Sequence, residues 1–478
     1  MIMLVGIGWL LFISYNSARQ AWVDGLMEAW FMSKGLVIYK DFASQYFPTL
    51  YFLMVPFHRI FGFVQNPTIF LAPFTSIVTF ITLAIISCKI LKGWYRFLPL
   101  IFFLIWDPVL SENHYSTTMF QNTLILVAFG LWWSWFDKPR KIYAFIIGLL
   151  LGIASTSGQI VSIFSAVVGF SILYRVIKER SKVHNIIFFS AGFLIPYVFI
   201  FSWLFYHGAL EAFFNWAIAY YFSGGGYPYA MGRGWENLLF YFTFFSPLIF
   251  VVILFFQKKG LMQSKRTFWL LMFLTFLVPF WFAIFHPNRL MTVEAIMAIS
   301  LGLSLQELTR NRKKINFLKG VSVFLLAMLI ITFYFVMIPI YKRNFSHPPE
   351  TRNRTATYPD DPMYEINKWV INNTPKEAKL FATTDSIIYL ETDRLMANPR
   401  AVTNLPVFYR EINQAALELQ DNPPDYWVID ERQWKRFEDM GFTQASQVLQ
   451  KILSCEQVIF QAEYVTIRKH EAGKDLCL

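Results

Sequence analysis

The chain has 478 residues, of which 56% are hydrophobic, only 15% are charged and 52 are phenylalanine. Soluble globular domains carry about a quarter charged residues, so this composition excludes an ordinary soluble protein and favours one that lies in a bilayer. The net charge is +11. The basic residues stand in short clusters between apolar runs, which is typical of membrane orientation signals and argues against nucleic-acid binding. Cys88, Cys455 and Cys477 have no metal-type spacing and predict no disulfide framework, although a Cys455–Cys477 bridge stays open.

Apolar runs recur from the N-terminus through residue 341, each long enough to cross about 30 Å of hydrocarbon as a helix. We count eleven, near residues 1–15, 69–91, 96–110, 119–136, 142–155, 160–176, 186–206, 237–256, 267–284, 291–307 and 318–341. The first run lacks the basic start and the cleavage site of a signal peptide, so we expect it to remain as the first span. Residues 1–341 are therefore predicted to form an α-helical polytopic membrane domain.

Lys and Arg are distributed unequally between alternate connections. Nineteen lie in one set and six in the other, namely Arg19, Lys34, Lys40, Arg59, Arg233 and Arg289. By the positive-inside rule the richer set and the N-terminus are cytoplasmic. This count requires the apolar segment 47–62 not to cross. Its two prolines, His58 and Arg59 favour an amphipathic helix in the outer interface, with an ordinary span as the alternative.

The composition becomes polar after residue 341, where two prolines and a run of Asn, Arg, Thr and Asp predict a linker. Residues 342–478 are predicted to form a small soluble α/β domain outside the cytoplasmic membrane. MYEINKWVINN and SQVLQKILSC have helical periodicity, whereas KLFATT, SIIYLET, YWVID and QVIFQAEYVTI are typical of strands. Asp385, Asp393 and His470 are isolated there, so they predict no catalytic constellation, and a binding or positioning role for this domain stays open.

The first outer loop, residues 22–62, is long and polar beside the membrane, and such loops tend to carry function. Asp24 and Glu28 stand four residues apart, on one face if this segment is a helix. A carboxylate just beyond the first span can accept a proton from a hydroxyl or amine that attacks a sugar carbon. A solvated or helix-capping carboxylate is the alternative for Asp24.

The order of motifs here carries a family resemblance. A short first span, Asp24, a helix reaching Gly35, Tyr39-Lys40-Asp41-Phe42, Pro48 and a closing Ile60-Phe61-Gly62 follow one another. This order resembles the GT-C glycosyltransferases, such as bacterial aminoarabinose transferases and protein O-mannosyltransferases, over about residues 1–340. In that family the acid after the first span is the catalytic carboxylate, and two helices lie along the membrane before the second span. The resemblance implies that Asp24 is the catalytic base, with Glu28 and Asp41 as candidate supporting acids.

Two positions depart from the family pattern. Its frequent Asp-Glu pair is Asp24-Gly25 here. Its Thr-Lys pair between the fifth and sixth spans is replaced by Ser155-Thr156-Ser157-Gly158-Gln159, so a phosphate-binding lysine is missing from that turn. Glu112 and His114, in the next long outer loop, are candidates for acceptor binding or for a divalent metal, with a polar turn as the alternative. No metal site is predicted.

Later outer loops supply candidate donor-binding groups. In related enzymes basic residues of these loops contact the lipid phosphate, which implies that role for Arg233 and Arg289; snorkelling to anionic lipid is the alternative. Three glycines with aromatic neighbours predict a mobile lid, made of Gly224, Gly225, Gly226, Tyr227 and Tyr229. No strand precedes these glycines and no Lys-Ser or Lys-Thr follows, so they are not a P-loop.

The predicted function is that of an inverting membrane glycosyltransferase. It would move a hexosyl or pentosyl group from a polyprenyl-phosphate donor to a lipid, glycan or protein acceptor at the outer face of the cytoplasmic membrane. Membrane lipid, donor and acceptor are its expected partners, and nucleic acid is not. A lipid or polysaccharide transporter is the first alternative, and the scarcity of charges inside the spans argues against it. A non-catalytic membrane scaffold with a partner-binding outer domain is the second.

Overall fold

The chain divides into two compact units, each of which gathers segments far apart in the sequence. The computed structural model describes residues 2–16, 23–44, 46–61, 65–110, 116–159, 161–179, 183–219, 244, 290–310, 334, 338, 362–384, 387–398, 417–419, 421–432, 438–439 and 443–470. Unit 1 comprises Met1–Arg19, Thr68–Ile200 and Pro228–Pro349, and unit 2 comprises Gln20–Pro67, Phe201–Tyr227 and Glu350–Leu478. The first outer loop thus belongs to the same unit as the C-terminal residues, while the predicted domain boundary at residue 341 stays a prediction.

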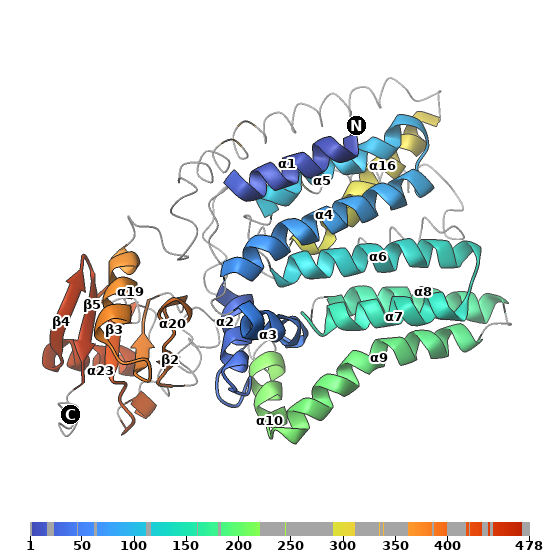
Figure 1. Cartoon of the computed structure of the whole chain (residues 1–478). Helices are drawn as coiled ribbons and strands as arrows, with labels where there is room; N and C mark the ends of the chain where they lie inside the picture. The colour runs from blue at the N-terminus through green and yellow to red at the C-terminus, as the bar shows by residue number, and fades with distance from the viewer. Residues whose placement is uncertain are drawn as a thin grey trace. The chain divides into compact units, whose positions relative to one another are not determined.

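Unit 1 consists of long helices that lie side by side (Figure 1). They are α1 (Ile2–Asn16), α4 (Gln65–Ile90), the 3-10 helix η1 (Gly93–Phe97), α5 (Leu98–Leu110), α6 (Thr117–Asp137), α7 (Lys141–Ser155), α8 (Val161–Glu179), α9 (Val183–Tyr206), the 3-10 helix η5 (Met291–Val293) and α16 (Glu294–Arg310). Each α-helix among them overlaps a predicted apolar run, whereas η1 lies mostly between the runs 69–91 and 96–110. The runs 237–256, 267–284 and 318–341 lie almost entirely outside the described residues.

The described helices differ in whether they are long and apolar enough to cross a bilayer. Leu71–Ile90 and Val183–Tyr206 are long and apolar enough. Shorter apolar helices cover Met3–Ile13, Lys141–Ser155, Val161–Ile177 and Leu290–Gln306. The total of eleven spans stays a prediction.

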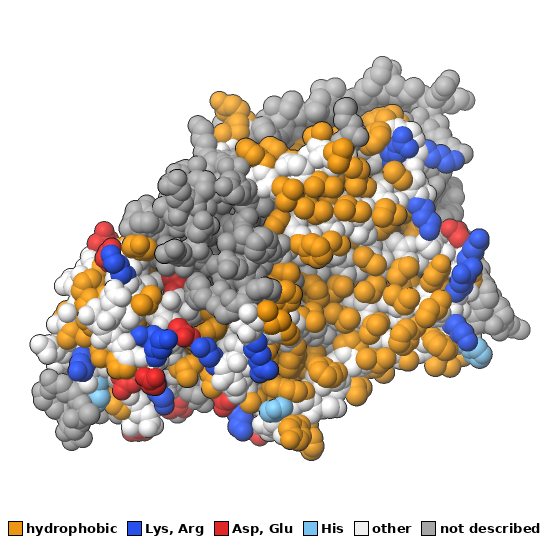
Figure 2. Space-filling model, in the orientation of Figure 1, with side chains coloured by type: hydrophobic (Ala, Val, Ile, Leu, Met, Phe, Trp, Pro, Cys, Tyr) orange, Lys and Arg blue, Asp and Glu red, His pale blue; other side chains and the backbone are white. Residues whose placement is uncertain are grey.

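The face of unit 1 seen in Figure 2 is mainly apolar. Hydrophobic side chains cover the visible face of its helices, and Lys and Arg gather near one end (Figure 2). Ile85, Phe170 and Phe199 are 65%, 64% and 61% exposed. Such exposure would be costly in water but is expected for side chains that contact lipid. At the basic end, Lys89 of α4 donates to the hydroxyl of Ser134 in α6 at 2.6 Å.

Close backbone approaches hold these helices together. A Cβ on Gly148 or Gly152 of α7 would lie 2.1 Å from the carbonyl oxygen of Phe189 or 2.5 Å from that of Phe193, both in α9. Helices that approach so closely need glycine at the contact, as is common between membrane helices. The start of α5 lies near the end of α16. The backbone N–H of Lys92, just before η1 and α5, donates to Oε1 of Gln306 near the end of α16 at 2.6 Å, as expected for antiparallel helices.

Unit 2 contains the helices of the first outer loop, the segment after α9 and an α/β domain. Its elements are α2 (Val23–Ser33), α3 (Thr49–Phe61), α10 (Leu210–Phe213), a π-helical stretch (Phe214–Ala219), α19 (Pro362–Asn373), β1 (Lys379–Ala382), α20 (Ile387–Thr392), β2 (Leu395–Met396), β3 (Tyr426–Asp430), α23 (Thr443–Cys455), β4 (Gln457–Ala462) and β5 (Val465–Lys469). The sheet order is β2-β1-β3-β5-β4. β1 pairs in parallel with β2 and β3, and β5 is antiparallel to β3 and β4.

The predicted α/β domain is confirmed in its helices and in most of its strands, and one assignment is wrong. SIIYLET was predicted as a strand, but Ile387–Thr392 is the helix α20. Residues 388–392 are all buried, so this short segment shows no helical periodicity in its sequence. A crossover between the parallel strands β1 and β2 usually requires a helix, and that topology decides the structure.

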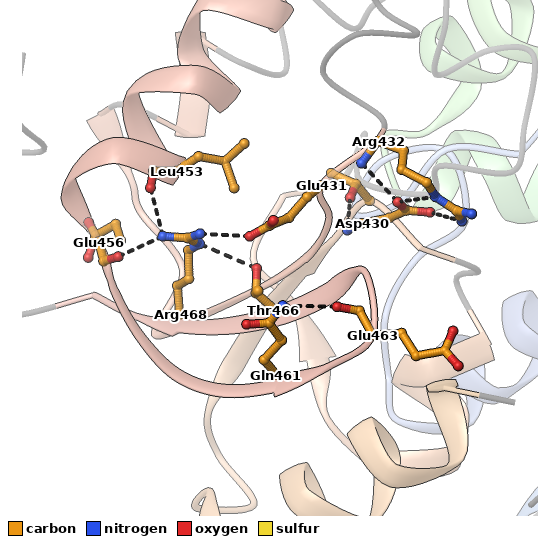
Figure 3. Close-up of polar contacts among 10 residues, drawn as sticks. Asp430, Glu431, Arg432, Leu453, Glu456, Gln461, Glu463, Thr466 and Arg468 are labelled. Atoms are coloured by element: carbon orange, nitrogen blue, oxygen red, sulfur yellow. Dashed lines mark hydrogen bonds and ion pairs between the residues drawn. The ribbon is translucent and has the colours of Figure 1, made fainter.

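A buried arginine connects the antiparallel part of the sheet to the end of α23. Arg468 of β5 donates to the carbonyl oxygens of Leu453 and Glu456 at 2.7 and 3.0 Å and pairs with the carboxylate of Glu431 at 2.9 Å (Figure 3). These contacts satisfy carbonyls at the end of α23, where a helix has unpaired acceptors. Nearby, the guanidinium of Arg432 makes a bidentate contact with the carboxylate of Asp430, with Nε 2.9 Å from Oδ1 and Nη2 2.7 Å from Oδ2. Cys88 and Cys455 are thiols, and Cys477 lies outside the described residues.

Candidate active site in the first outer loop

The backbone of α2 places the predicted catalytic residue directly beyond the first apolar helix. α1 ends at Asn16 and α2 begins at Val23, so Asp24 lies in the first turn of α2. A carboxylate in the first turn of a helix is stabilised by the helix dipole. The side chain of Asp24 lies outside the described part of the structure, and its catalytic role stays a prediction.

Glu28 lies one turn further along α2 and is fully buried. The hydroxyl of Tyr51 in α3 lies 3.4 Å from its Oε1, and the same hydroxyl lies 3.4 Å from the hydroxyl of Ser44. Glu28 is therefore not a solvated loop acid. It links α2 to α3, the two helices that the GT-C resemblance predicts to lie along the membrane.

Asp41 organises the loop between these helices. Its Oδ2 accepts the backbone N–H of Val37 at 2.7 Å, while its own N–H donates to the carbonyl of Val37 at 2.8 Å. Tyr39 has a φ of 69° inside this turn. Side chains of Asn and Asp commonly stabilise turns in this way. The geometry gives Asp41 a role in the loop's shape, and a direct role in the reaction stays a prediction.

Aromatic side chains at the end of α9 and in α10 pack on this loop. Phe213 of α10 contacts Tyr39 and Phe47 with ring centroids 5.2 and 5.0 Å apart, and Trp203 contacts Phe52 of α3 at 4.8 Å. These contacts bring the segment that leads toward the predicted lid against the first outer loop. The lid residues themselves, Gly224, Gly225, Gly226, Tyr227 and Tyr229, lie outside the described residues.

The remaining predicted site residues are not described either. These are Glu112, His114, Arg233 and Arg289. Within the described residues, no group of three or more His, Cys, Asp and Glu side chains gathers as a metal site. The turn at Ser155-Thr156-Ser157 is described and buried, and the hydroxyls of Thr156 and Ser157 donate to carbonyls of α7 at 2.8 Å.

A buried pair of acids in unit 1 was not predicted. Asp107 of α5 and Glu294 of α16 are 3% and 0% exposed, and their charges interact. Ser76 donates to Oδ2 of Asp107 at 2.9 Å, and the amide of Asn122 donates to Oε2 of Glu294 at 3.5 Å. Oδ1 of Asp107 and Oε1 of Glu294 have no hydrogen-bond partner among the described residues. An ionisable residue inside an apolar run could have indicated this site, and Glu294 is such a residue in the run 291–307.

Comparisons with known proteins show the fold. No protein-family model matches the chain, and no curated protein matches it. The oligosaccharyltransferase AglB of Archaeoglobus fulgidus, solved with a tethered acceptor peptide, is 13% identical with a TM-score of 0.55, over 94% of this chain and 72% of AglB. ArnT of Cupriavidus metallidurans, solved with undecaprenyl phosphate, is 10% identical with a TM-score of 0.59, over 99% of this chain and 98% of ArnT. The chain therefore has the GT-C fold.

Proposed function

We propose that this chain is a multi-pass membrane glycosyltransferase that uses a polyprenyl-phosphate sugar as donor. The observation that carries the proposal is the position of Asp24 in the first turn of α2, directly after the first apolar helix of a GT-C fold. Structures with this fold include ArnT bound to undecaprenyl phosphate and AglB in complex with dolichol-phosphate and an inhibitory peptide. Lipid-linked phosphates are thus the ligand class for which the fold is suited.

The proposed reaction is a single displacement at the anomeric carbon. Asp24 accepts the proton of an acceptor hydroxyl or amine, whose oxygen or nitrogen forms a bond to that carbon. The bond between the carbon and the phosphate oxygen breaks, and the polyprenyl phosphate leaves with the bonding electrons. Arg233 and Arg289 stabilise the charge on the leaving phosphate. Attack from the opposite face inverts the anomeric configuration.

The other groups of the loop support this step. Glu28 and Asp41 fix α2, α3 and the turn between them through the contacts described above, so they hold Asp24 rather than touch the reacting atoms. Residues 224–229 close over the donor. Glu112 and His114 would offer oxygen and nitrogen ligands to a divalent metal, and the proposal assigns no step to one.

Sugar transfer from a panel of radiolabelled polyprenyl-phosphate donors by the purified chain in lipid tests the proposal. We expect turnover with one donor class, an inverted product, and a loss of at least 100-fold in Asp24→Asn, in line with the loss of a general base. Asp421→Asn, an exposed acid of the α/β domain, is the matched control and should keep full turnover. A product that retains the donor's anomeric configuration would overturn the single displacement. Full activity in Asp24→Asn would show that another residue is the general base.

The buried acids Asp107 and Glu294 favour a second candidate function, that of a transporter. Ionisable residues inside spans are typical of transport pathways. Wild-type protein that transfers no sugar but moves lipid-linked sugar across vesicle membranes would favour the transporter.

A further inference from the structure

A helix of the α/β domain packs directly on the helix that carries Asp24. Phe31 of α2 and Tyr389 of α20 are both fully buried, and their ring centroids lie 6.2 Å apart. Phe31 also contacts Phe42 of the first outer loop at 5.2 Å. Segments from opposite ends of the sequence thus share one small aromatic core within unit 2.

The two helices end in the same kind of turn, and an ion pair joins these turns. Gly35 has a φ of 93° after α2, where the N–H of Leu36 returns to the carbonyl of Phe31 at 3.1 Å. Asp393 has a φ of 53° after α20, and the N–H of Arg394 returns to the carbonyl of Tyr389 at 3.1 Å. Both are Schellman turns. Lys34, directly before Gly35, places its Nζ 2.6 Å from Oδ1 of Asp393.

α20 is itself fixed to the sheet. The hydroxyl of Tyr389 accepts the backbone N–H of Ala382, the last residue of β1, at 3.0 Å. The buried guanidinium of Arg394 donates to the carbonyls of Thr392 and Thr374 at 2.6 and 2.7 Å. α20 therefore cannot shift without breaking hydrogen bonds to β1 and to the end of α19.

Contacts at the C-terminal end of α2 also affect its N-terminal turn, where Asp24 lies. Seven residues separate Asp24 from Phe31, which is two turns of helix and about 10 Å along its axis. Fixing the C-terminal end of so short a helix also restricts its N-terminal turn. A displacement of about 1 Å at a reacting group can cost on the order of 100-fold in rate.

We propose that Tyr389 and Asp393 of the α/β domain are positioning residues that hold α2, and through it Asp24, in the geometry the reaction needs. The role of Asp24 in this inference rests on the proposed function, whereas the anchoring of α2 does not. The α/β domain is then a structural part of the active site.

Kinetics of four variants test the positioning role. Tyr389→Leu should lower kcat about tenfold with little change in the donor KM, because donor phosphate is bound elsewhere. Tyr389→Phe keeps the ring against Phe31 but removes the acceptor of the Ala382 N–H, so it should recover only part of that loss. Asp393→Asn keeps a residue that tolerates positive φ, and should lower kcat only two- to threefold because the ion pair is half exposed. Lys34→Met/Asp393→Asn should cost no more than Asp393→Asn alone, as for two partners of one interaction.

Hydrogen exchange of the full chain in lipid separates this inference from the proposed function. Amides of residues 23–36 should exchange at least fivefold faster in Tyr389→Leu than in wild type, while β3 and β5 keep their protection. Glu456→Gln is the matched control, because Glu456 pairs with His470 at 2.9 Å within the α/β domain, and it should leave residues 23–36 unchanged. Unchanged exchange in Tyr389→Leu would overturn the anchoring even if sugar transfer is found. Faster exchange in Tyr389→Leu with an unchanged kcat would overturn the positioning role. If the wild-type chain transfers no sugar, faster exchange in Tyr389→Leu would leave the anchoring standing while the proposed function fails.

Discussion

Tyr51 and Glu28 join the two helices of the first outer loop, with the phenol hydroxyl 3.4 Å from the carboxylate oxygen. Both side chains are fully buried. A buried carboxylate is costly unless hydrogen bonds compensate for the water it has lost. A polar contact thus helps to hold α2 against α3.

Glu28→Ala should destabilise unit 2, because it leaves the hydroxyl of Tyr51 without this acceptor. Losing one partner of a buried hydrogen bond costs about 1–3 kcal/mol. Thermal unfolding in lipid should show the loss, and sugar transfer should fall with it. Glu456→Gln is the control for removing an acid elsewhere in the unit. Unfolding of Glu28→Ala at the wild-type temperature would show that this contact adds no stability.

Glycine spacing in α7 predicts a second stability effect. Gly152→Ala places a methyl group 2.5 Å from the carbonyl oxygen of Phe193, so α7 and α9 must move apart. We expect a loss of about 1–3 kcal/mol, measured by thermal unfolding. Gly8→Ala in α1 meets nothing within 4 Å and is the matched control. It should be neutral or slightly stabilising, since alanine favours helix more than glycine.

His58 of α3 predicts a pH effect. Its ring is buried, both ring nitrogens lack a hydrogen-bond partner among the described residues, and burial lowers its pKa from 6.5 to about 4. Between these values the unfolded chain binds a proton that the folded chain does not, so the free energy of unfolding falls as pH drops from 6.5 to about 4. At about 1.4 kcal/mol per pKa unit, the loss is about 3 kcal/mol.

The variant His58→Leu isolates this effect from other acids that titrate in the same range. Its unfolding temperature should exceed that of wild type, and the difference should grow as pH falls from 6.5 to 4. A difference that stays constant with pH would show that His58 keeps its ordinary pKa in the folded protein.

Periodic features of the sequence predicted most of the described fold, and the reasons for the misses are physical. Apolar runs located the helices of unit 1, and strand-like runs located β1, β3 and the pair β4 and β5, which was predicted as one run. α20 was missed because it is only six residues long and its polar residues Glu391 and Thr392 are buried along with its apolar ones, so its sequence shows no helical period. The placement of α20 against α2 depends on contacts between residues far apart in the sequence, which no local pattern encodes.

The candidate site shows the same limit. Asp24 and Glu28 were found because they are acids in a short segment beside an apolar run. The partnership of Lys34 with Asp393 was not found, because Asp393 stands isolated in its own segment. Positive φ at Asp393 marks the turn that presents its carboxylate, and a backbone conformation of that kind leaves only a weak signal in one sequence.

Asp107 and Glu294 yield the last prediction. Two buried acids whose charges interact are costly to ionise together, and replacing such a pair by neutral groups is often harmless or stabilising. The hydroxyl of Ser76 and the amide of Asn122 can also hydrogen-bond to the oxygens of Asn and Gln. We therefore expect Asp107→Asn/Glu294→Gln to unfold in lipid at or above the wild-type temperature.

Asn122→Ala is the contrasting change. It removes the donor to Glu294 and also the acceptor of the backbone N–H of Ala295, which lies 3.3 Å from Oδ1 of Asn122. Loss of two buried partners should lower the free energy of unfolding by about 2–4 kcal/mol. If the neutral double variant is stable but its transport or transfer activity is lost, the two carboxyl groups serve function rather than packing. The burial of both acids in the helices of unit 1 would then mark a path for a proton or cation, as charges inside spans usually do.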